Sequence, residues 1–241
     1  MQFRNVPTIG PRYWAALCLA SVFGANMGDF VSHNLHLGHA NGLFPLLLAF
    51  LGVVAAERLT GFTTEAWYWV AIVILRTAAT NLGDLLTHDF RIPYPFAVAG
   101  LAVLLLSILL AEPRSASTSS GLPATSVFYW LAMLTAGTLG TAGGDYVAGD
   151  LGLGVGLGTI VLSAVLAASL ITRAMTGLIA RWSYWLTVVA VRSAGTTAGD
   201  YCAGRHGLAL GLPLSTSLFG MAFLVLLVAW RSHARAPATA I

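Results

Sequence analysis

Four aspartates recur at matched positions in a chain that carries few charges. Each follows a glycine and lies 15 residues after the Trp of a Tyr-Trp pair; the four are Asp29, Asp84, Asp145 and Asp200. The chain has only nine acidic residues in all. An acid within a membrane costs about 2.5–3.5 kcal/mol, so it usually faces a cavity or a partner and marks an ion or proton path. The structural alternative is that these carboxyl groups cap backbone groups or bind hydroxyl groups between helices.

Two arginines break the fourfold pattern. Seven residues after the Trp, the second and fourth copies carry Arg76 and Arg192, whereas the other two copies carry Ser21 and Gly137. An unpaired charge near mid-membrane is very costly, so we expect these arginines to form salt bridges with aspartates of other helices. Four Asp against two Arg leave a formal charge of −2 if all ionise. That surplus suits a divalent cation, two monovalent cations or two protons; purely structural Arg–Asp pairs are the alternative.

Two histidines lie one helical turn beyond two of the aspartates. His33 follows Asp29 and His88 follows Asp84 at the same spacing, while the third and fourth copies have glycine there. Residues four apart share a helix face, so two Asp and two His could form one cluster, with His36 and His39 nearby. Such a cluster suits Zn²⁺ or Mn²⁺-class ions or a proton relay. Ordinary interfacial histidines are the third interpretation.

Composition indicates that lipid surrounds the elements that carry these residues. The 241 residues are 57% hydrophobic and 9% charged, with a mean hydropathy of +0.81, whereas soluble domains are about one quarter charged. All twelve basic residues are arginine, so no lysine can form a Schiff base, and a rhodopsin-like pigment is excluded. The arginines are dispersed at the ends of apolar runs, which is a membrane pattern and argues against nucleic-acid binding.

Each Tyr-Trp…Gly-Asp copy predicts one unit of two membrane-spanning helices, because a span needs about 20 mainly apolar residues. The first helices are predicted at 12–34, 67–88, 128–149 and 183–204, and the second at 41–57, 94–111, 153–172 and 209–230. The fold class is therefore an all-α integral membrane protein with eight transmembrane helices. Because each unit crosses the membrane twice, every unit starts on the same side of the membrane. The four repeats are therefore parallel, related by an axis along the membrane normal. They form two pseudo-equivalent halves, 1–114 and 124–241, joined by a linker at 115–123.

Arginine counting predicts the orientation. The side with both termini and the inter-unit loops has eight arginines and the intra-unit turns have two, Arg91 and Arg205. The eight are Arg4, Arg12, Arg58, Arg114, Arg173, Arg181, Arg231 and Arg235. Cytoplasmic loops of membrane proteins carry an excess of Lys and Arg, so both termini are expected in the cytoplasm.

Two features of the first helices predict how those helices are placed. The Tyr-Trp pairs are expected to be interfacial aromatic anchors, with an aromatic gate as the alternative. Small-xxx-small pairs are expected to form a packing seam; these are Gly24/Gly28, Ala79/Gly83, Gly140/Gly144 and Gly195/Gly199.

The repeated segments resemble a bacterial membrane-protein repeat family of unknown function. The resemblance rests on Tyr-Trp followed by Thr-Ala-Ala-Thr-Asn-Leu-Gly-Asp at 77–84 or Gly-Thr-Ala-Gly-Gly-Asp-Tyr at 140–146, with a similar segment at 195–201. It implies four tandem two-helix repeats in a bacterial inner membrane, and no activity. Many members have a Lys where this chain has Leu17, Ile72, Met133 and Val188, and some copies have a Glu where it has Ala25, Thr80, Thr141 and Thr196. If those charges serve transport in the family, the departures imply a different ligand or none for this chain.

The leading hypothesis is a small transporter or channel-like carrier for a cation, a proton or a small solute. Its path would use Asp29, Asp84, Asp145, Asp200, Arg76, Arg192, Thr80, Thr141 and Thr196. The alternatives are a non-transporting membrane scaffold and a metal- or haem-binding protein, in which His33 and His88 would hold a divalent metal ion. No P-loop, G-x-S-x-G, H-E-x-x-H or C-x-x-C motif occurs, so we do not expect an enzyme. The expected partners are the lipid bilayer and a small ion or solute, with a homo-oligomer left open.

Overall fold

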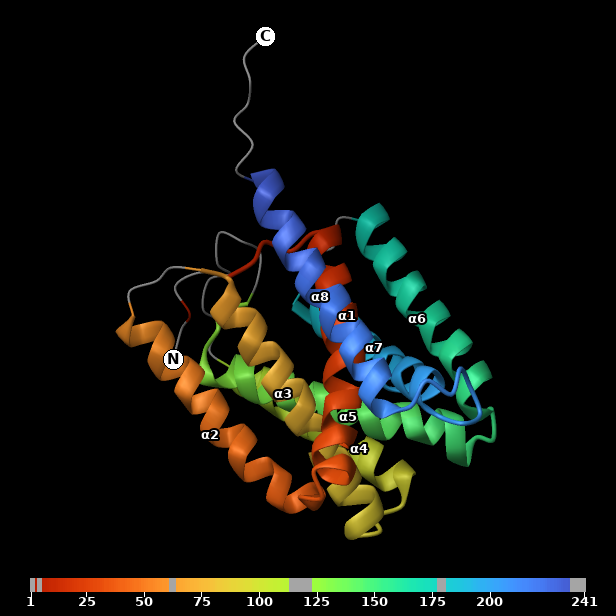
Figure 1. Ribbon diagram of the computed structural model, residues 1–241. Helices are drawn as coiled ribbons and strands as arrows, with labels where there is room; N and C mark the ends of the chain where they lie inside the picture. The colour runs from red at the N-terminus through yellow and green to blue at the C-terminus, as the bar shows by residue number, and fades with distance from the viewer. Residues whose placement is uncertain (1–2, 4–5, 61–63, 113–122, 177–180, 235–241) are drawn as a thin grey trace.

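The computed structural model describes residues 3, 6–60, 64–112, 123–176 and 181–234, and these residues form an all-helical bundle without strands (Figure 1). Arg4, Arg114 and Arg235, which entered the predicted orientation, lie outside the described residues. So do residues 115–122 of the predicted linker.

Eight α-helices form within the described ranges, close to the predicted positions. The first helices of the units are α1 (Pro11–Asp29), α3 (Ala66–Asp84), α5 (Val127–Asp145) and α7 (Arg181–Ala203). The second helices are α2 (Gly38–Leu59), α4 (Tyr94–Ala111), α6 (Gly154–Thr176) and α8 (Leu212–Ala234). Local signals start several of them. Pro11 occupies the first turn of α1, where its missing N–H is not needed, and the Ser126 hydroxyl caps α5 by accepting from the Tyr129 amide.

The four first helices form a closed ring in which α1 packs on α3, α3 on α5, α5 on α7, and α7 back on α1. The predicted small-residue seam holds this ring together. A Cβ added at Gly28 would meet Thr80 of α3 at 2.6 Å, and one added at Gly83 would meet Thr141 of α5 at 2.9 Å. Gly140 and Gly195 make still closer approaches, to Arg192 of α7 and to Ser21 of α1. Small residues let neighbouring helix backbones approach closely, so the packing seam is confirmed.

Each second helix packs mainly against the first helix of the next unit along the ring. Thus α2 packs on α3, α4 on α5, α6 on α7, and α8 closes the cycle on α1. Two of these helices also reach one unit further, because Phe50 of α2 stacks on Trp130 of α5 and Phe223 of α8 stacks on Trp69 of α3. The two sequence halves are therefore interlocked in space. Figure 1 shows α2 and α6 at the periphery, with α1, α5 and α7 more central.

Six helical segments of the described chain are long and apolar enough to cross a membrane. They are Pro11–Asn34, Gly38–Leu59, Ala66–Asp89, Tyr94–Ala111, Gly154–Thr176 and Leu212–Ala229. The remaining two helices, α5 and α7, belong to the inner ring and are rich in Gly and Thr. Their small and polar residues pack the ring, and these two helices are not among the described segments apolar enough to span a membrane.

Three of the four inner helices change from α to π geometry directly after the aspartate. The π-helical segments are Phe30–Asn34, Leu85–Asp89 and Tyr146–Asp150. Each is closed by a backbone bond to the residue five earlier, such as Leu35 N to Phe30 O at 3.0 Å. A π-helical turn is rare and frequently marks a functional site. In this fold it places each of these aspartates at the junction of two helix types.

Candidate functional site

A row of residues four apart runs along the inner face of every ring helix, from the Tyr of the Tyr-Trp pair to the Asp. The spacing from Tyr to Asp is 16 residues in all four copies, or four such steps. Rows of this kind are the ridges by which helices pack. Equivalent residues of the four units consequently form layers along one pseudo-symmetry axis.

The first layer is a closed ring of four tyrosine hydroxyls. The Tyr13 hydroxyl lies 3.0 Å from that of Tyr68 and 2.7 Å from that of Tyr184, and Tyr129 completes the ring at 2.6 Å from Tyr68 and 3.0 Å from Tyr184. All four tyrosines are at most 2% exposed. A hydroxyl can donate once and accept as well, so each tyrosine can satisfy its neighbours around the cycle.

The four tryptophans of the Tyr-Trp pairs pack around the outside of this tyrosine ring. Each Trp packs edge-on against its own Tyr and also stacks on the Tyr of the preceding unit, as Trp69 does with Tyr68 at 5.2 Å and with Tyr13 at 5.6 Å. The four paired tryptophans are at most 7% exposed. The prediction that the Tyr-Trp pairs are interfacial anchors is therefore wrong: an anchor presents its ring to the lipid headgroups, whereas these rings close the centre of the bundle.

An apolar layer and Arg192 come next along the axis. The apolar layer consists of Leu17, Ile72, Met133 and Val188, all at most 1% exposed. Arg192 is buried, and its Nη2 donates to Met133 Sδ at 3.8 Å, on the tyrosine side. Its Nε and Nη1 have no hydrogen-bond partner among the described residues. This end of the axis therefore contains a desolvated guanidinium without a carboxylate beside it.

Arg76 comes from the equivalent position of α3 and extends toward the opposite end. Its Nη1 donates to Thr80 at 2.9 Å and to Thr141 at 2.8 Å, and its Nη2 donates to Thr196 at 2.6 Å. Its Nε donates to the carbonyl and hydroxyl oxygens of Ser21 at 3.3 Å. The predicted Arg–Asp salt bridges are absent among the described residues. Hydroxyl groups of four helices hold the guanidinium, because the carboxyl groups lie one layer further out.

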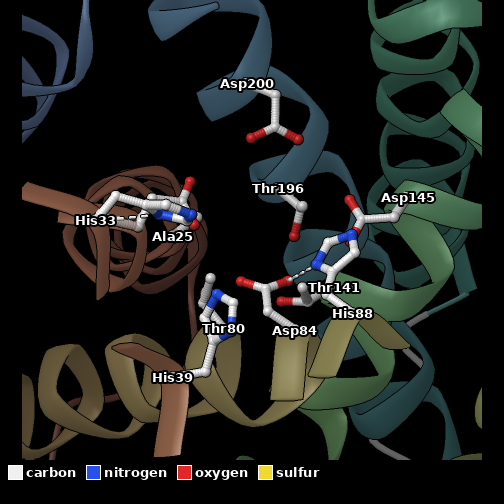
Figure 2. Close-up of a pocket in the computed structure, with 11 residues that line it drawn as sticks. Ala25, His33, His39, Thr80, Asp84, His88, Thr141, Asp145, Thr196 and Asp200 are labelled. Atoms are coloured by element: carbon white, nitrogen blue, oxygen red, sulfur yellow. Dashed lines mark hydrogen bonds and ion pairs between the residues drawn. The ribbon is translucent and has the colours of Figure 1, made fainter. Parts of the chain in front are cut away.

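The four aspartates converge on one cavity of about 480 Å³ above this threonine layer. Its lining residues are Ala25, Asp29, His33, His39, Thr80, Asp84, His88, Thr141, Asp145, Thr196 and Asp200. In Figure 2 the carboxyl groups of Asp84, Asp145 and Asp200 point toward a common space, with Thr141 and Thr196 deeper in it. The cavity therefore unites seven of the nine residues assigned to the path. Arg76 supports its floor, and Arg192 lies below, away from it.

The carboxyl groups have almost no partners within the protein. Asp84 is 6% exposed, and its Oδ1 lies 3.8 Å from His88 Nδ1. Among the described residues no hydrogen bond reaches the side chains of Asp29, Asp145 or Asp200. Asp84 is buried, whereas Asp29, Asp145 and Asp200 are partly exposed where they line the cavity. The structural interpretation, in which these acids bind hydroxyl or backbone groups, therefore lacks support from the contacts.

Three histidines surround the mouth of the cavity. His33 and His88, the predicted pair, line it together with His39 from the start of α2. The ring centroids of His33 and His39 are 5.5 Å apart, and those of His39 and His88 are 6.3 Å apart. His39 Nδ1 lies 3.0 Å from Asp89 Oδ1. Within the described chain no three His, Cys, Asp or Glu side chains are arranged to hold a metal ion, so the geometry adds nothing to the metal hypothesis.

The sequence predicts His39 near the Asp/His cluster but does not assign it to the path. It lines the cavity because α2 packs against α3 of the following unit. The tyrosine ring, by contrast, was not predicted. The tyrosine ring did have a signal, since each Tyr is a multiple of four residues from its Asp and so shares its helix face. In the second half, Asp150, Arg205 and His206 are exposed and do not line the cavity.

Comparison with known proteins identifies the repeat and nothing more specific. No curated protein and no solved structure matches the chain significantly. A family model described as Repeat of Unknown Function (DUF347) matches residues 12–62, 67–118, 128–177 and 183–236. The four matched segments coincide with the four two-helix units and cover most of the sequence. The chain therefore belongs to the DUF347 repeat family, as the resemblance of its repeats predicts.

Proposed function

We propose that this protein is a membrane carrier that binds a cationic solute or ion in the aspartate cavity. The observation that carries the proposal is the convergence of Asp29, Asp84, Asp145 and Asp200 on one chamber. Carboxylates in a low-dielectric surrounding need a compensating charge. Since hydrogen bonds within the protein do not supply it, a bound cation would.

The layers below the cavity support a carrier more than an open channel. A threonine layer with Arg76, an apolar layer and the hydrogen-bonded tyrosine ring close the axis in turn. A carrier in one of its end states has a site that is accessible from a single side. Alternating access around a fixed site is the usual mechanism of transporters built from repeats.

The sidedness of this state follows from the arginines. Arg12, Arg58 and Arg173 belong to the end of the bundle that holds the tyrosine ring, and the positive-inside rule assigns that end to the cytoplasm. We therefore propose a bacterial inner-membrane protein with both termini cytoplasmic. The cavity would then face outward.

Flux measurements on purified protein in liposomes test the proposal. A pH-sensitive dye inside reports proton flux, and direct measurement of the uptake of each cation reports cation flux for a panel of monovalent, divalent and organic cations added outside. We expect cation or proton flux from the native protein. Replacing Asp84 or Asp200 by Asn should abolish that flux while thermal unfolding in detergent remains native-like. Asp150→Asn is the matched control, because Asp150 is exposed and does not line the cavity. Native-level flux in both cavity variants would reject the proposal.

A non-transporting scaffold is the second candidate. The hydrogen-bonded layers that close the axis at the tyrosine end favour it. The tyrosine ring and the contacts of Arg76 are fully structural arrangements. On this alternative, the native protein moves no cation, and the Asp substitutions lower thermal stability without changing any cation affinity. The two candidates therefore make opposite predictions for the same variants.

A further inference from the structure

The cavity offers four carboxyl groups as acceptors and no permanently cationic donor among its described lining residues. Among its described lining residues are four carboxyl groups, three hydroxyl groups and three imidazoles, and none is an arginine, a lysine or an amide side chain. Ionised carboxylates accept hydrogen bonds and cannot donate them. A ligand that fits must therefore bring both positive charge and N–H or O–H donors.

Arg76, the cation directly beneath the cavity, is not available to a ligand. The Arg76 guanidinium uses Nε on Ser21, both donors of Nη1 on Thr80 and Thr141, and Nη2 on Thr196 and the Arg192 carbonyl. Guanidinium has five donors, and these contacts occupy all of them. The cavity therefore offers an anionic group no arginine, and its remaining donors are the imidazoles at its mouth, where His39 Nε2 has no partner among the described residues. Four carboxyl groups outnumber these three imidazoles, so the lining favours a cation over an amino acid or another zwitterion.

Two further observations bear on the size and type of the cation. The cavity of about 480 Å³ would hold about 16 water molecules at their volume in the liquid, which is far more than a single desolvated metal ion fills. The described donor atoms also fail to converge in a group of three for such an ion. The carboxyl groups come from four different helices around the cavity, so they can contact separate parts of an extended ligand.

Among the four carboxyl groups of the cavity, that of Asp84 is the most buried and gives the clearest sign that a ligand is expected. It is 94% buried, points into the cavity in Figure 2, and has no hydrogen bond from the described residues; its only ion-pair contact, to His88, is 3.8 Å long. A carboxylate held in this way remains poorly compensated. An N–H donor of a cationic ligand would satisfy it.

We propose that the substrate is an organic cation with at least two ammonium or guanidinium groups, such as a linear diamine or polyamine. This inference rests on the proposed function, since it names the substrate class of the same cavity. Two or three such groups match the formal surplus, which is −2 when both arginines are counted and −3 when only Arg76, the arginine directly beneath the cavity, is counted. Each group would donate to a different pair of carboxylates, and charge-assisted bonds of this kind are the stronger ones.

Calorimetric binding to the purified protein in detergent tests this class with five probes. They are the diamine putrescine, the triamine spermidine, the monoamine butylamine, the fully N-methylated bis-quaternary analogue of putrescine, and Mn²⁺. We expect putrescine and spermidine to bind at least about tenfold more tightly than butylamine and than the quaternary analogue, which has the charges and no N–H donor. Asp84→Asn and Asp200→Asn should each weaken diamine binding at least about tenfold, and Asp150→Asn should not.

The outcomes separate this inference from the proposed function. Equal affinity for butylamine and putrescine overturns the requirement for two charges, and equal affinity for the quaternary analogue overturns the requirement for N–H donors. Tighter binding of Mn²⁺, lost in Asp84→Asn, overturns the organic substrate and keeps the cation carrier. Failure of every probe to bind, together with absent flux for the wider cation panel, rejects both.

Discussion

The two ends of the pseudo-symmetry axis are built from the same four helices and satisfy their polar groups in opposite ways. At the tyrosine end, every hydroxyl of the ring has two partners within the protein. At the aspartate end, 16 residues along each helix, the carboxyl groups surround a cavity and receive no hydrogen bond from the described residues. The contrast indicates that the closed end contributes to stability. The aspartate end leaves its carboxyl groups without hydrogen-bond donors among the described residues.

The two arginines at one equivalent position of the repeat also extend in opposite directions and differ in their hydrogen bonds. Arg76 extends toward the threonines and has all its donors satisfied, whereas Arg192 extends toward the tyrosine ring and leaves Nε and Nη1 without partners among the described residues. Identical positions on opposite members of the helix ring thus contribute differently to the two ends. Single substitutions can measure that difference.

The largest expected effect comes from forcing the ring helices apart, which would damage both ends at once. Gly140→Val adds bulk where a Cβ already overlaps Arg192 of α7. We expect a loss of about 3 kcal/mol or more in the free energy of unfolding. Thermal unfolding and the yield of monodisperse protein in detergent measure it. The control is Gly100→Val, because Gly100 lies on the exposed face of α4 with no atom within 4 Å of an added Cβ.

Disrupting the tyrosine end alone should lower the free energy of unfolding by a smaller amount. Tyr68→Phe removes the hydroxyl that joins Tyr13 and Tyr129 and leaves both neighbours with an unfilled hydrogen-bonding site in a dry environment. We expect a loss of about 2 kcal/mol, visible as a lower unfolding temperature. Tyr146→Phe serves as the comparison, since Tyr146 is half-buried and lies outside the ring. Equal effects of the two substitutions would contradict a stabilising tyrosine ring.

The two arginines give a matched pair of intermediate effect. Arg76→Met breaks contacts with Ser21, Thr80, Thr141 and Thr196, whereas Arg192→Met removes a buried charge with few partners. We expect Arg76→Met to destabilise the protein more than Arg192→Met, by about 1–3 kcal/mol. Thermal unfolding of both variants in the same detergent decides it. The reverse order would contradict the view that the hydrogen bonds of Arg76 contribute more to stability than the sparse contacts of Arg192.

The smallest effect on stability is expected at the open end. Asp84→Asn and Asp200→Asn remove a charge and break no hydrogen bond with the described residues. Their unfolding free energies should stay within about 0.5 kcal/mol of the native value or rise slightly. The same variants should lose cation binding, so a stability assay and a binding assay on one sample separate the two ends. A marked destabilisation would favour the scaffold alternative.

Much of the architecture could be predicted from the repeats. Four copies with one internal spacing imply four equivalent inner helices, and residues of one type at one depth. The glycines four residues apart predict the close helix packing, because small residues allow it wherever the partner lies. The aspartates share a face with the threonines by helical periodicity alone, so their common placement at the cavity follows from the pattern.

Other features depended on which helix each face meets, which a sequence period does not specify. The period places Tyr13 and Arg76 on an inner face, but only the closure of the ring brings the four hydroxyls within hydrogen-bonding distance and offers Arg76 threonines of two other helices. The Arg–Asp pairs were wrong for this reason, since distance along one helix cannot rank partners on its neighbours. Likewise, His39 enters the cavity through the packing of α2 on the next unit. The sequence by itself determined depth and face, and the tertiary structure decided partners, because partners depend on how the small residues of the ring let one helix settle against another.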